Sequence, residues 1–400
     1  MKTAVAITPE IDDVELAVKE LASQIREKLQ LERNSIGIAY CDADMDVARL
    51  GELLRTELGI DIIGLTTIAA IERHTGYNDM GVLLSVLTAD DVTFSIGSTG
   101  RLDSDSFPDV IRKTYAKTRA EISDDPKLIL ALAPYIEGIS SDHYVEILDE
   151  VSGSVPVFGG VATDHFDLKH QRTFYNGQEY SRGLVFLLFA GNIKPIFSMK
   201  HNFNLIGEKR GVITKTTRNL VEKVNDKTFK EFVVSMVPVS DETNVAFIFH
   251  STPFVMELPD YEKNEPPVLR ALCTIDHETG TGGFLSKMPK GSKLYLSTFS
   301  LDNMRRSCKE ALSSLTDQIA DNSDYNYSMV FIITCNGRHG MMGSIKTLES
   351  DIVKDKLGAF PPELNATGFY AFGEICPTGE RADGGAKNRF HNISFALCAI

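Results

Sequence analysis

The stretch KLILALAPYIEGISSDHYVEILDEVSGSVPVFGGVATD (127–164) contains a complete strand–helix–strand unit. Residues 127–135 form an apolar run of strand length, and 155–164 form a second one that breaks at two glycines. Between them, 141–153 carries apolar residues at helical spacing and ends in glycine. This order predicts two parallel strands joined by a crossover helix, which is the repeating element of α/β folds.

A second stretch, in the C-terminal part of the chain, has the same order. SMVFIITCNG (328–337) has a strand pattern, KTLESDIVKDKLG (346–358) a helix pattern, and ATGFYAFGEI (366–375) a strand pattern that breaks at Gly373. Each of the two stretches is followed by an apolar run typical of an antiparallel strand, 183–191 and 392–400. Either the chain contains an internal duplication or two ordinary βαβ units share a common pattern.

Both interpretations divide the chain near residue 191. We therefore predict an α/β fold with two βαβ-containing halves, mixed sheets and terminal antiparallel hairpin strands. The predicted domains are 1–191 and 192–400.

Shorter signals add detail to the N-terminal half. A helix over 47–58 is expected to end at Gly59, because glycine is favoured just after a helix. Asn176-Gly177 lies between two strand patterns and predicts a tight hairpin. The stretch 80–99 also reads as a hairpin, turning around Ala89 to Asp91.

The bulk composition limits the class of partner. The chain has 400 residues and a net charge of −14, so its surface does not suit nucleic acid or an anionic membrane. The six cysteines form no C-x-x-C pair, which favours reduced thiols over a disulfide framework or a zinc site. No secretory signal or membrane-spanning run is present, so a cytoplasmic location is expected.

Polar residues gather where the apolar strands end. In open α/β sheets ligands bind outside the carboxyl ends of the strands, and polar loops are held there by the scaffold. Glycines let backbone N–H groups approach a ligand, while an arginine and a glutamate could hold the two charges of an amino-acid-like molecule. The predicted ligand-binding residues are Gly159, Gly160, Asp164, Cys335, Asn336, Gly337, Arg338, Gly373, Glu374 and His391. No metal site is predicted.

Other roles for these residues stay open. Arg338 and Glu374 could form a structural ion pair over a polar turn. Cys335 could be a nucleophile, although no base and no known nucleophile motif accompany it. His201 lies among aromatic residues and could ligate a haem iron, since one axial imidazole is sufficient.

Six short motifs, in this order, resemble the FIST sensory-domain family. They are VPVFGGVATD (155–164), RTFYNGQEYSRGLVFLLFAG (172–191), SMKHNFNLIG (198–207), CNGR (335–338), GFYAFGEI (368–375) and HNISFALCAI (391–400). The first two are similar to the N-terminal FIST domain and the others to the C-terminal one. The resemblance spans roughly residues 30 to 400.

The resemblance implies a two-part, intracellular sensor that binds a small ligand. Together with the polar residues at the strand ends, we expect a non-enzymatic sensor of an amino acid or a related small metabolite. One branch of the family binds haem and reports nitric oxide, which makes a haem-based sensor the alternative function. A cysteine-dependent enzyme is the third hypothesis. Many relatives are fused to, or encoded near, histidine kinases or cyclic-di-nucleotide signalling enzymes, so the resemblance implies such a partner here. Strand edges and the aromatic hairpin near Tyr175 make a homodimer a further expectation.

Overall fold

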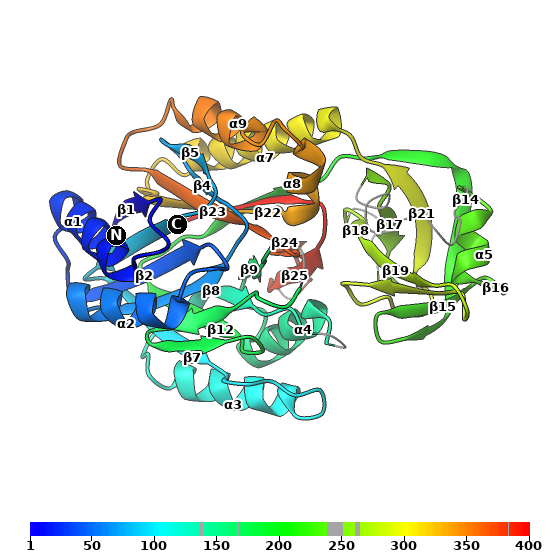
Figure 1. Ribbon diagram of the computed structural model, residues 1–400, viewed down its shortest axis with the longest axis horizontal. Helices are drawn as coiled ribbons and strands as arrows, with labels where there is room; N and C mark the ends of the chain where they lie inside the picture. Colours follow the sequence, from blue (N-terminus) through cyan, green and yellow to red (C-terminus); the bar gives the residue numbers. More distant parts are fainter. Residues whose placement is uncertain (137–138, 166–167, 238–250, 261–264, 383) are drawn as a thin grey trace.

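A computed structural model describes residues 1–136, 139–165, 168–237, 251–260, 265–382 and 384–400. Figure 1 shows a main body of helices around sheets, and beside it a smaller lobe rich in strands. The main body is built from three units with one order of elements. In each, a first strand, a helix, a strand, one or two helices and a strand are followed by a hairpin and a last strand.

The first unit occupies the N-terminal part of the chain, and the second follows it directly. The first consists of β1 (Lys2–Thr8), α1 (Val14–Lys28), β2 (Asn34–Cys41), α2 (Val47–Leu58), β3 (Asp61–Thr66), the hairpin β4 (Ala70–Glu72) and β5 (Gly76–Asn78), and β6 (Val82–Ala89). The second consists of β7 (Val92–Ser98), α3 (Phe107–Arg119), β8 (Pro126–Ala133), α4 (Ser141–Ser152), β9 (Val157–Val161), the hairpin β10 (Thr173–Tyr175) and β11 (Gln178–Tyr180), and β12 (Val185–Gly191).

The third unit is interrupted after its first strand by the lobe. It consists of β13 (Ile196–Lys200), α7 (Leu301–Asp321), β22 (Met329–Cys335), α8 (Asn336–Met342), α9 (Leu348–Leu357), β23 (Asn365–Ala371), the hairpin β24 (Glu374–Glu380) and β25 (Ala386–His391), and β26 (Phe395–Ala399). The inserted lobe, 204–298, contains β14 (Asn204–Thr217), β15 (Leu220–Val224), β16 (Lys227–Thr228), α5 (Phe229–Val234), β17 (Phe254–Glu257), β18 (Val268–Arg270), β19 (Leu272–Asp276), β20 (Thr281–Phe284) and β21 (Lys293–Thr298).

The three units exchange their hairpins in a cycle. The sheets of the main body have the strand orders β1-β6-β2-β3-β10-β11, β7-β12-β8-β9-β24-β25 and β13-β26-β22-β23-β4-β5. Each sheet thus combines four strands of its own unit with the hairpin of another unit. The second and third sheets therefore combine strands from both predicted domains, 1–191 and 192–400.

Each sheet of the main body contains one parallel pair of strands (β2–β3, β8–β9 and β22–β23), and the second strand of each pair carries a glycine that packs against the first. A side chain on Gly64, Gly159 or Gly368 would lie only 2.4, 1.9 or 1.8 Å from a carbonyl oxygen of the neighbouring parallel strand. Only glycine allows the two backbones to approach so closely. The same requirement in β3, β9 and β23 supports a threefold repeat of the unit.

Each sheet of the main body packs on both faces, one against the other sheets and one against helices. Residues alternate along each strand, so Leu128, Leu130 and Leu132 of β8 face a central cluster shared by all three sheets. Ile129 and Ala131 point the other way, into a cluster with α3 and α4. The other two sheets are covered by α1 and α2, and by α7, α8 and α9 (Figure 1). Within the described ranges, no helix is long and apolar enough to cross a membrane.

The predicted α/β class is confirmed, and several local predictions are confirmed with it. α2 ends at Gly59, which has a left-handed backbone with φ 68°. Thr173 to Tyr175 pair with Gln178 to Tyr180 around Asn176-Gly177, as the hairpin signal indicates. Our prediction of a hairpin over 80–99 was wrong, because β6 pairs with β1 and β2 while β7 pairs with β12 in another sheet. β6 is buried along its whole length and lies between β1 and β2 inside the first sheet.

Candidate functional site

The strand ends that carry the predicted site residues meet at one place. β22 and β23 are parallel neighbours, so Cys335 and Ala371 end side by side. The chain then leaves β23 as β24 and pairs with β9, which places Glu374 opposite Gly160. Cys335, Glu374 and the two glycines of β9 are therefore brought together from two different sheets. This convergence rests on hairpin exchange and not on adjacent loops of one sheet.

Glu374 is a fully buried carboxyl group at the centre of this junction. Its Oε2 accepts hydrogen bonds from the backbone N–H of Ser394 at 3.0 Å and from its hydroxyl at 2.6 Å. Its Oε1 has no hydrogen-bond partner of ordinary geometry within the described residues, although the Cys335 thiol lies close enough to act on the carboxyl group. Burial raises the pKa of Glu374 to about 8, although the Ser394 hydrogen bonds and the charge of Arg338 oppose the rise. At neutral pH the protonated form therefore predominates.

His391 lies directly opposite Glu374 in the β24–β25 hairpin. Its Nε2 lies 3.2 Å from the carbonyl oxygen of Cys376, and its Nδ1 has no partner in the described part of the chain. Burial, with the nearby charges of His201 and Arg270, lowers the pKa of His391 to about 3. The ring is therefore neutral, and a proton on Nε2 leaves Nδ1 as a hydrogen-bond acceptor.

Two buried asparagines complete the group. Asn336 is the first residue of α8, directly after Cys335, and neither its amide oxygen nor its nitrogen has a partner among the described residues. Asn392 accepts hydrogen bonds at Oδ1 from Ser286 at 2.7 Å and from the N–H of Ala271 at 3.4 Å, both in the inserted lobe. Its Nδ2 has no described partner. We refer to Asn336, Glu374, His391, Asn392 and Ser394 as the buried polar cluster.

Arg338 has a different partner from the one that the sequence suggests. Its Nε donates to Glu349 at 2.7 Å and its Nη2 lies 2.6 Å from the same carboxylate, with both side chains fully buried. The remaining N–H groups face Ser307 and the carbonyl oxygens of Met304 and Ile393. The predicted polar turn is also a helix, α8. Arg338 is thus held inside the protein beside the cluster.

The predicted glycines lie in tightly packed backbone. A Cβ on Gly160 would lie within 3.1 Å of Ile333, Ala371 and Phe369, and one on Gly373 would strike the ring of Phe390. Gly159 approaches the backbone of β8, and Gly337 is buried in α8. At these glycines the space that a side chain would fill is occupied by other parts of the protein.

The thiol of Cys335 is buried in the same region. Burial and the charge of Glu374 raise its pKa well above the ordinary value. A protonated, enclosed thiol is a poor nucleophile, so the geometry does not favour the cysteine-dependent enzyme.

Asp164 organises a loop. Its carboxylate accepts hydrogen bonds from the backbone N–H groups of Leu168, Lys169, His170 and Gln171. A carboxylate with several N–H donors needs no ligand to satisfy it. The structure therefore places Asp164 at the base of the loop that follows β9.

His201 lies at the entrance to the inserted lobe, where β13 ends. Its Nε2 lies 2.6 Å from the carbonyl oxygen of Pro267, and its ring packs edge-on against Phe203. Burial lowers the pKa of His201. Since Nε2 is already engaged, the surroundings of His201 do not fit an axial haem ligand.

Sequence reasoning missed Asn392, Ser394 and the lobe residues that reach them. The sequence could have indicated Asn392 and Ser394, because three of the four residues from His391 to Ser394 are polar and an apolar strand follows them. Ala271 and Ser286 gave no such signal, because their contact with Asn392 depends on how the lobe docks.

Comparisons with known proteins agree with this architecture. A family model of the FIST N domain matches residues 35–227, and one of the FIST C domain matches 229–377. No curated protein matches the chain. Among solved structures, a cyanuric acid hydrolase from A. caulinodans is 9% identical over 99% of this chain and 97% of its own, with a TM-score of 0.35. PurL from T. maritima, complexed with ATP, is 8% identical over 100% of this chain and 70% of its own, with a TM-score of 0.22.

These two TM-scores are too low to establish a shared fold. The two family models, in contrast, together match most of the chain in the expected order. The chain therefore belongs to the FIST family, whose domains are small-ligand sensory domains in signal transduction.

Proposed function

We propose that this protein is a non-enzymatic sensor of a small polar ligand, and that the ligand binds at the buried polar cluster. One observation carries the proposal. Glu374 Oε1, His391 Nδ1, Asn392 Nδ2 and both amide atoms of Asn336 are buried without a described hydrogen-bond partner. Leaving such atoms unpaired costs roughly 1–3 kcal/mol each, so a ligand that pairs them gains affinity.

The types of atom in the cluster favour an amino-acid-like ligand. Glu374 and His391 offer acceptors to an ammonium group, and binding a cation would draw the Glu374 carboxyl into its ionised form. The amide nitrogens of Asn336 and Asn392 can donate to a carboxylate. Arg338 acts as a positioning residue, because its own donors point to Glu349 and its neighbours.

The inserted lobe offers a route from binding to signal. Ala271 and Ser286 contact the cluster through Asn392. A cavity of about 290 Å³ lies between the lobe and the main body, and it is lined by Arg270 and Phe390, the chain neighbours of Ala271 and His391. A ligand that binds Nδ2 of Asn392 changes how firmly the same side chain holds the lobe through Oδ1, and so shifts the equilibrium between docked and undocked lobe positions. We propose that a histidine kinase or a cyclic-di-nucleotide enzyme in the cytoplasm reads that shift, with a homodimer as the signalling unit.

Calorimetric titration of the full chain with amino acids, amines and related metabolites tests the proposal. At least one compound is expected to bind with a Kd below a millimolar, and Glu374→Gln is expected to weaken it by tenfold or more. Glu363→Gln, at an exposed glutamate, is the matched control and leaves the affinity unchanged. If no compound binds, or if both variants bind alike, the cluster is not the ligand site.

A further inference from the structure

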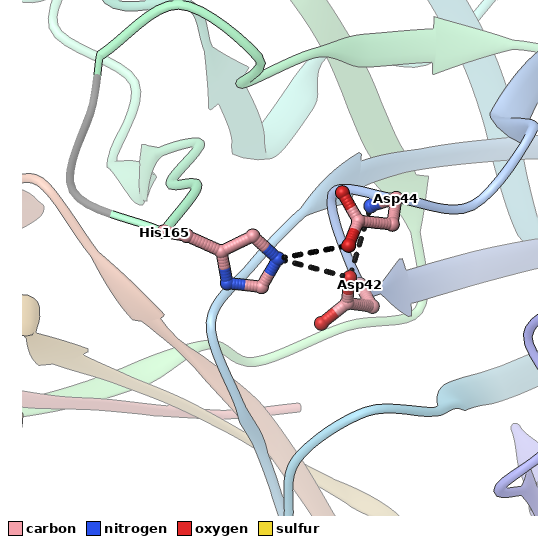
Figure 2. Close-up of side chains that lie close together, drawn as sticks. All are labelled: Asp42, Asp44 and His165. Atoms are coloured by element: carbon pink, nitrogen blue, oxygen red, sulfur yellow. Dashed lines mark hydrogen bonds and ion pairs between the residues drawn. The ribbon is translucent and has the colours of Figure 1, made fainter.

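A second group of polar side chains lies away from the buried polar cluster. Figure 2 shows Asp42 and Asp44, which follow β2, with their carboxylates directed toward the ring of His165 from the opposite side. Their potential ligand atoms all lie within 4.8 Å of one another. The pair comes from the first unit of the main body and the histidine from the second.

The spacing of these atoms fits one small divalent cation. Nε2 of His165 lies 3.3 Å from Asp42 Oδ1 and 3.6 Å from Asp44 Oδ2. Nitrogen and oxygen ligands at 2.0–2.2 Å around a tetrahedral zinc ion are separated from each other by about 3.4 Å. The three side chains therefore need little movement to share a cation.

The second observation concerns Asp42 alone. The residue is only 3% exposed, and its Oδ2 has no hydrogen-bond partner within the described residues. Its Oδ1 accepts from the backbone N–H of Asp44 at 2.9 Å. In the view of Figure 2, both Asp42 oxygens project on the side of the carboxylate that faces His165. A buried, unpaired carboxylate oxygen is costly, and a bound cation satisfies it.

The backbone holds the group in place from both units. The N–H of Asp42 donates to the carbonyl of Gly81 at 3.2 Å, which ties the end of β2 to the chain before β6. His165 directly follows Asp164, whose carboxylate binds four backbone N–H groups. The three ligands thus depend on the hairpin exchange, which brings the loop after β9 to the end of β2.

We propose that Asp42, Asp44 and His165 bind one divalent cation of the zinc type. Imidazole nitrogen and carboxylate oxygen both ligate zinc, and three protein ligands leave a fourth position open to water. The side chains of Asp44 and His165 are 75% and 49% exposed, so that position faces solvent. This site is independent of the proposed small-ligand site.

Metal titration of the tag-free full chain, after treatment with a chelator, tests the proposal. Co²⁺ is the spectroscopic probe, and Zn²⁺ is added afterwards as competitor. One Co²⁺ is expected to bind per chain, with visible bands of a nitrogen and oxygen site, and to be displaced by Zn²⁺. His165→Ala and Asp44→Asn each alter an exposed side chain, and each is expected to weaken Co²⁺ binding at least tenfold.

His74→Ala is the control, because it removes an exposed histidine outside the group. It is expected to leave affinity and stoichiometry unchanged. The proposal is overturned if His165→Ala binds Co²⁺ as tightly as the parent. It is also overturned if the bound ion shows a thiolate charge-transfer band, because the metal would then lie at one of the six cysteines.

Discussion

The carboxylate of Glu349 lies 2.6 Å from Nη2 of Arg338, and both side chains are fully buried. The arginine also faces Ser307 of α7 and the carbonyl oxygen of Ile393, so the pair joins α7, α8, α9 and the chain before β26. Thr334, at the end of β22, donates to the other oxygen of Glu349. The pair therefore fixes the backbone from which Asn336 and Ser394 project.

Replacing Arg338 by methionine is expected to lower the free energy of unfolding by about 3–5 kcal/mol, because it leaves the Glu349 charge buried without its partner. Urea unfolding measures the change. Arg112→Met, which breaks the exposed pair of Arg112 with Glu150, is the control and should cost less than about 1 kcal/mol. Adding Glu349→Leu to Arg338→Met should recover part of the loss. If Arg338→Met and Arg112→Met lowered the free energy of unfolding by the same amount, a structural role for the buried pair would be contradicted.

The raised pKa of Glu374 predicts a pH dependence of stability. Its ordinary pKa is 4.5 and the folded value is about 8, so the folded state holds more protons between these values. The free energy of unfolding therefore falls as the pH rises from about 4.5 to 8, by an amount on the order of a few kcal/mol. Glu374→Gln keeps a neutral group and removes this loss. Urea unfolding of parent and variant at pH 5 and pH 9 measures this loss. If Glu374→Gln lost as much stability between the two pH values as the parent, the loss would not come from Glu374.

The contact between Arg270 and Asp142 predicts how firmly the inserted lobe docks. Nη2 of Arg270 lies 2.9 Å from Asp142 Oδ1, and the N–H of Lys287 donates to Oδ2 at 2.8 Å. Asp142→Asn removes the charge opposite a buried guanidinium. Amide exchange over 268–287 is expected to accelerate about tenfold, as for a loss of about 1.4 kcal/mol in local stability, while exchange in β2 stays unchanged.

Glu146→Gln is the matched control for this measurement. Glu146 contacts Lys287 from the same helix, but on the exposed side of the interface. Its substitution should leave exchange in the lobe within about twofold of the parent. If Asp142→Asn behaves like this control, the lobe is held by other contacts.

The raised pKa of Cys335 predicts an unreactive thiol. Iodoacetamide at pH 8 is expected to leave Cys335 unmodified in the native protein and to modify it fully after denaturation, because only the thiolate reacts. Peptide mass spectrometry measures both. Rapid alkylation of the native protein at Cys335 would reopen the interpretation of this residue as a nucleophile.

Much of the fold could be predicted from local patterns. The apolar runs at 127–135 and 155–164 with a helix between them became β8, α4 and β9, because a buried strand needs side chains suited to both faces. Gly59 and Asn176-Gly177 mark their turns by backbone conformation alone. The polar ends of the strands at Cys335 and Glu374 also predicted where side chains would converge.

The sequence alone determined most of the strands, helices and turns, since hydrophobic periodicity and backbone preferences act over a few residues. Only the tertiary structure decided which sheet receives each hairpin. It therefore also decided that Arg338 pairs with Glu349, that Asn392 meets Ser286, and that Asp42 meets His165. Such pairings join residues that are distant along the chain. They depend on how three similar units pack together, and no local preference encodes that arrangement.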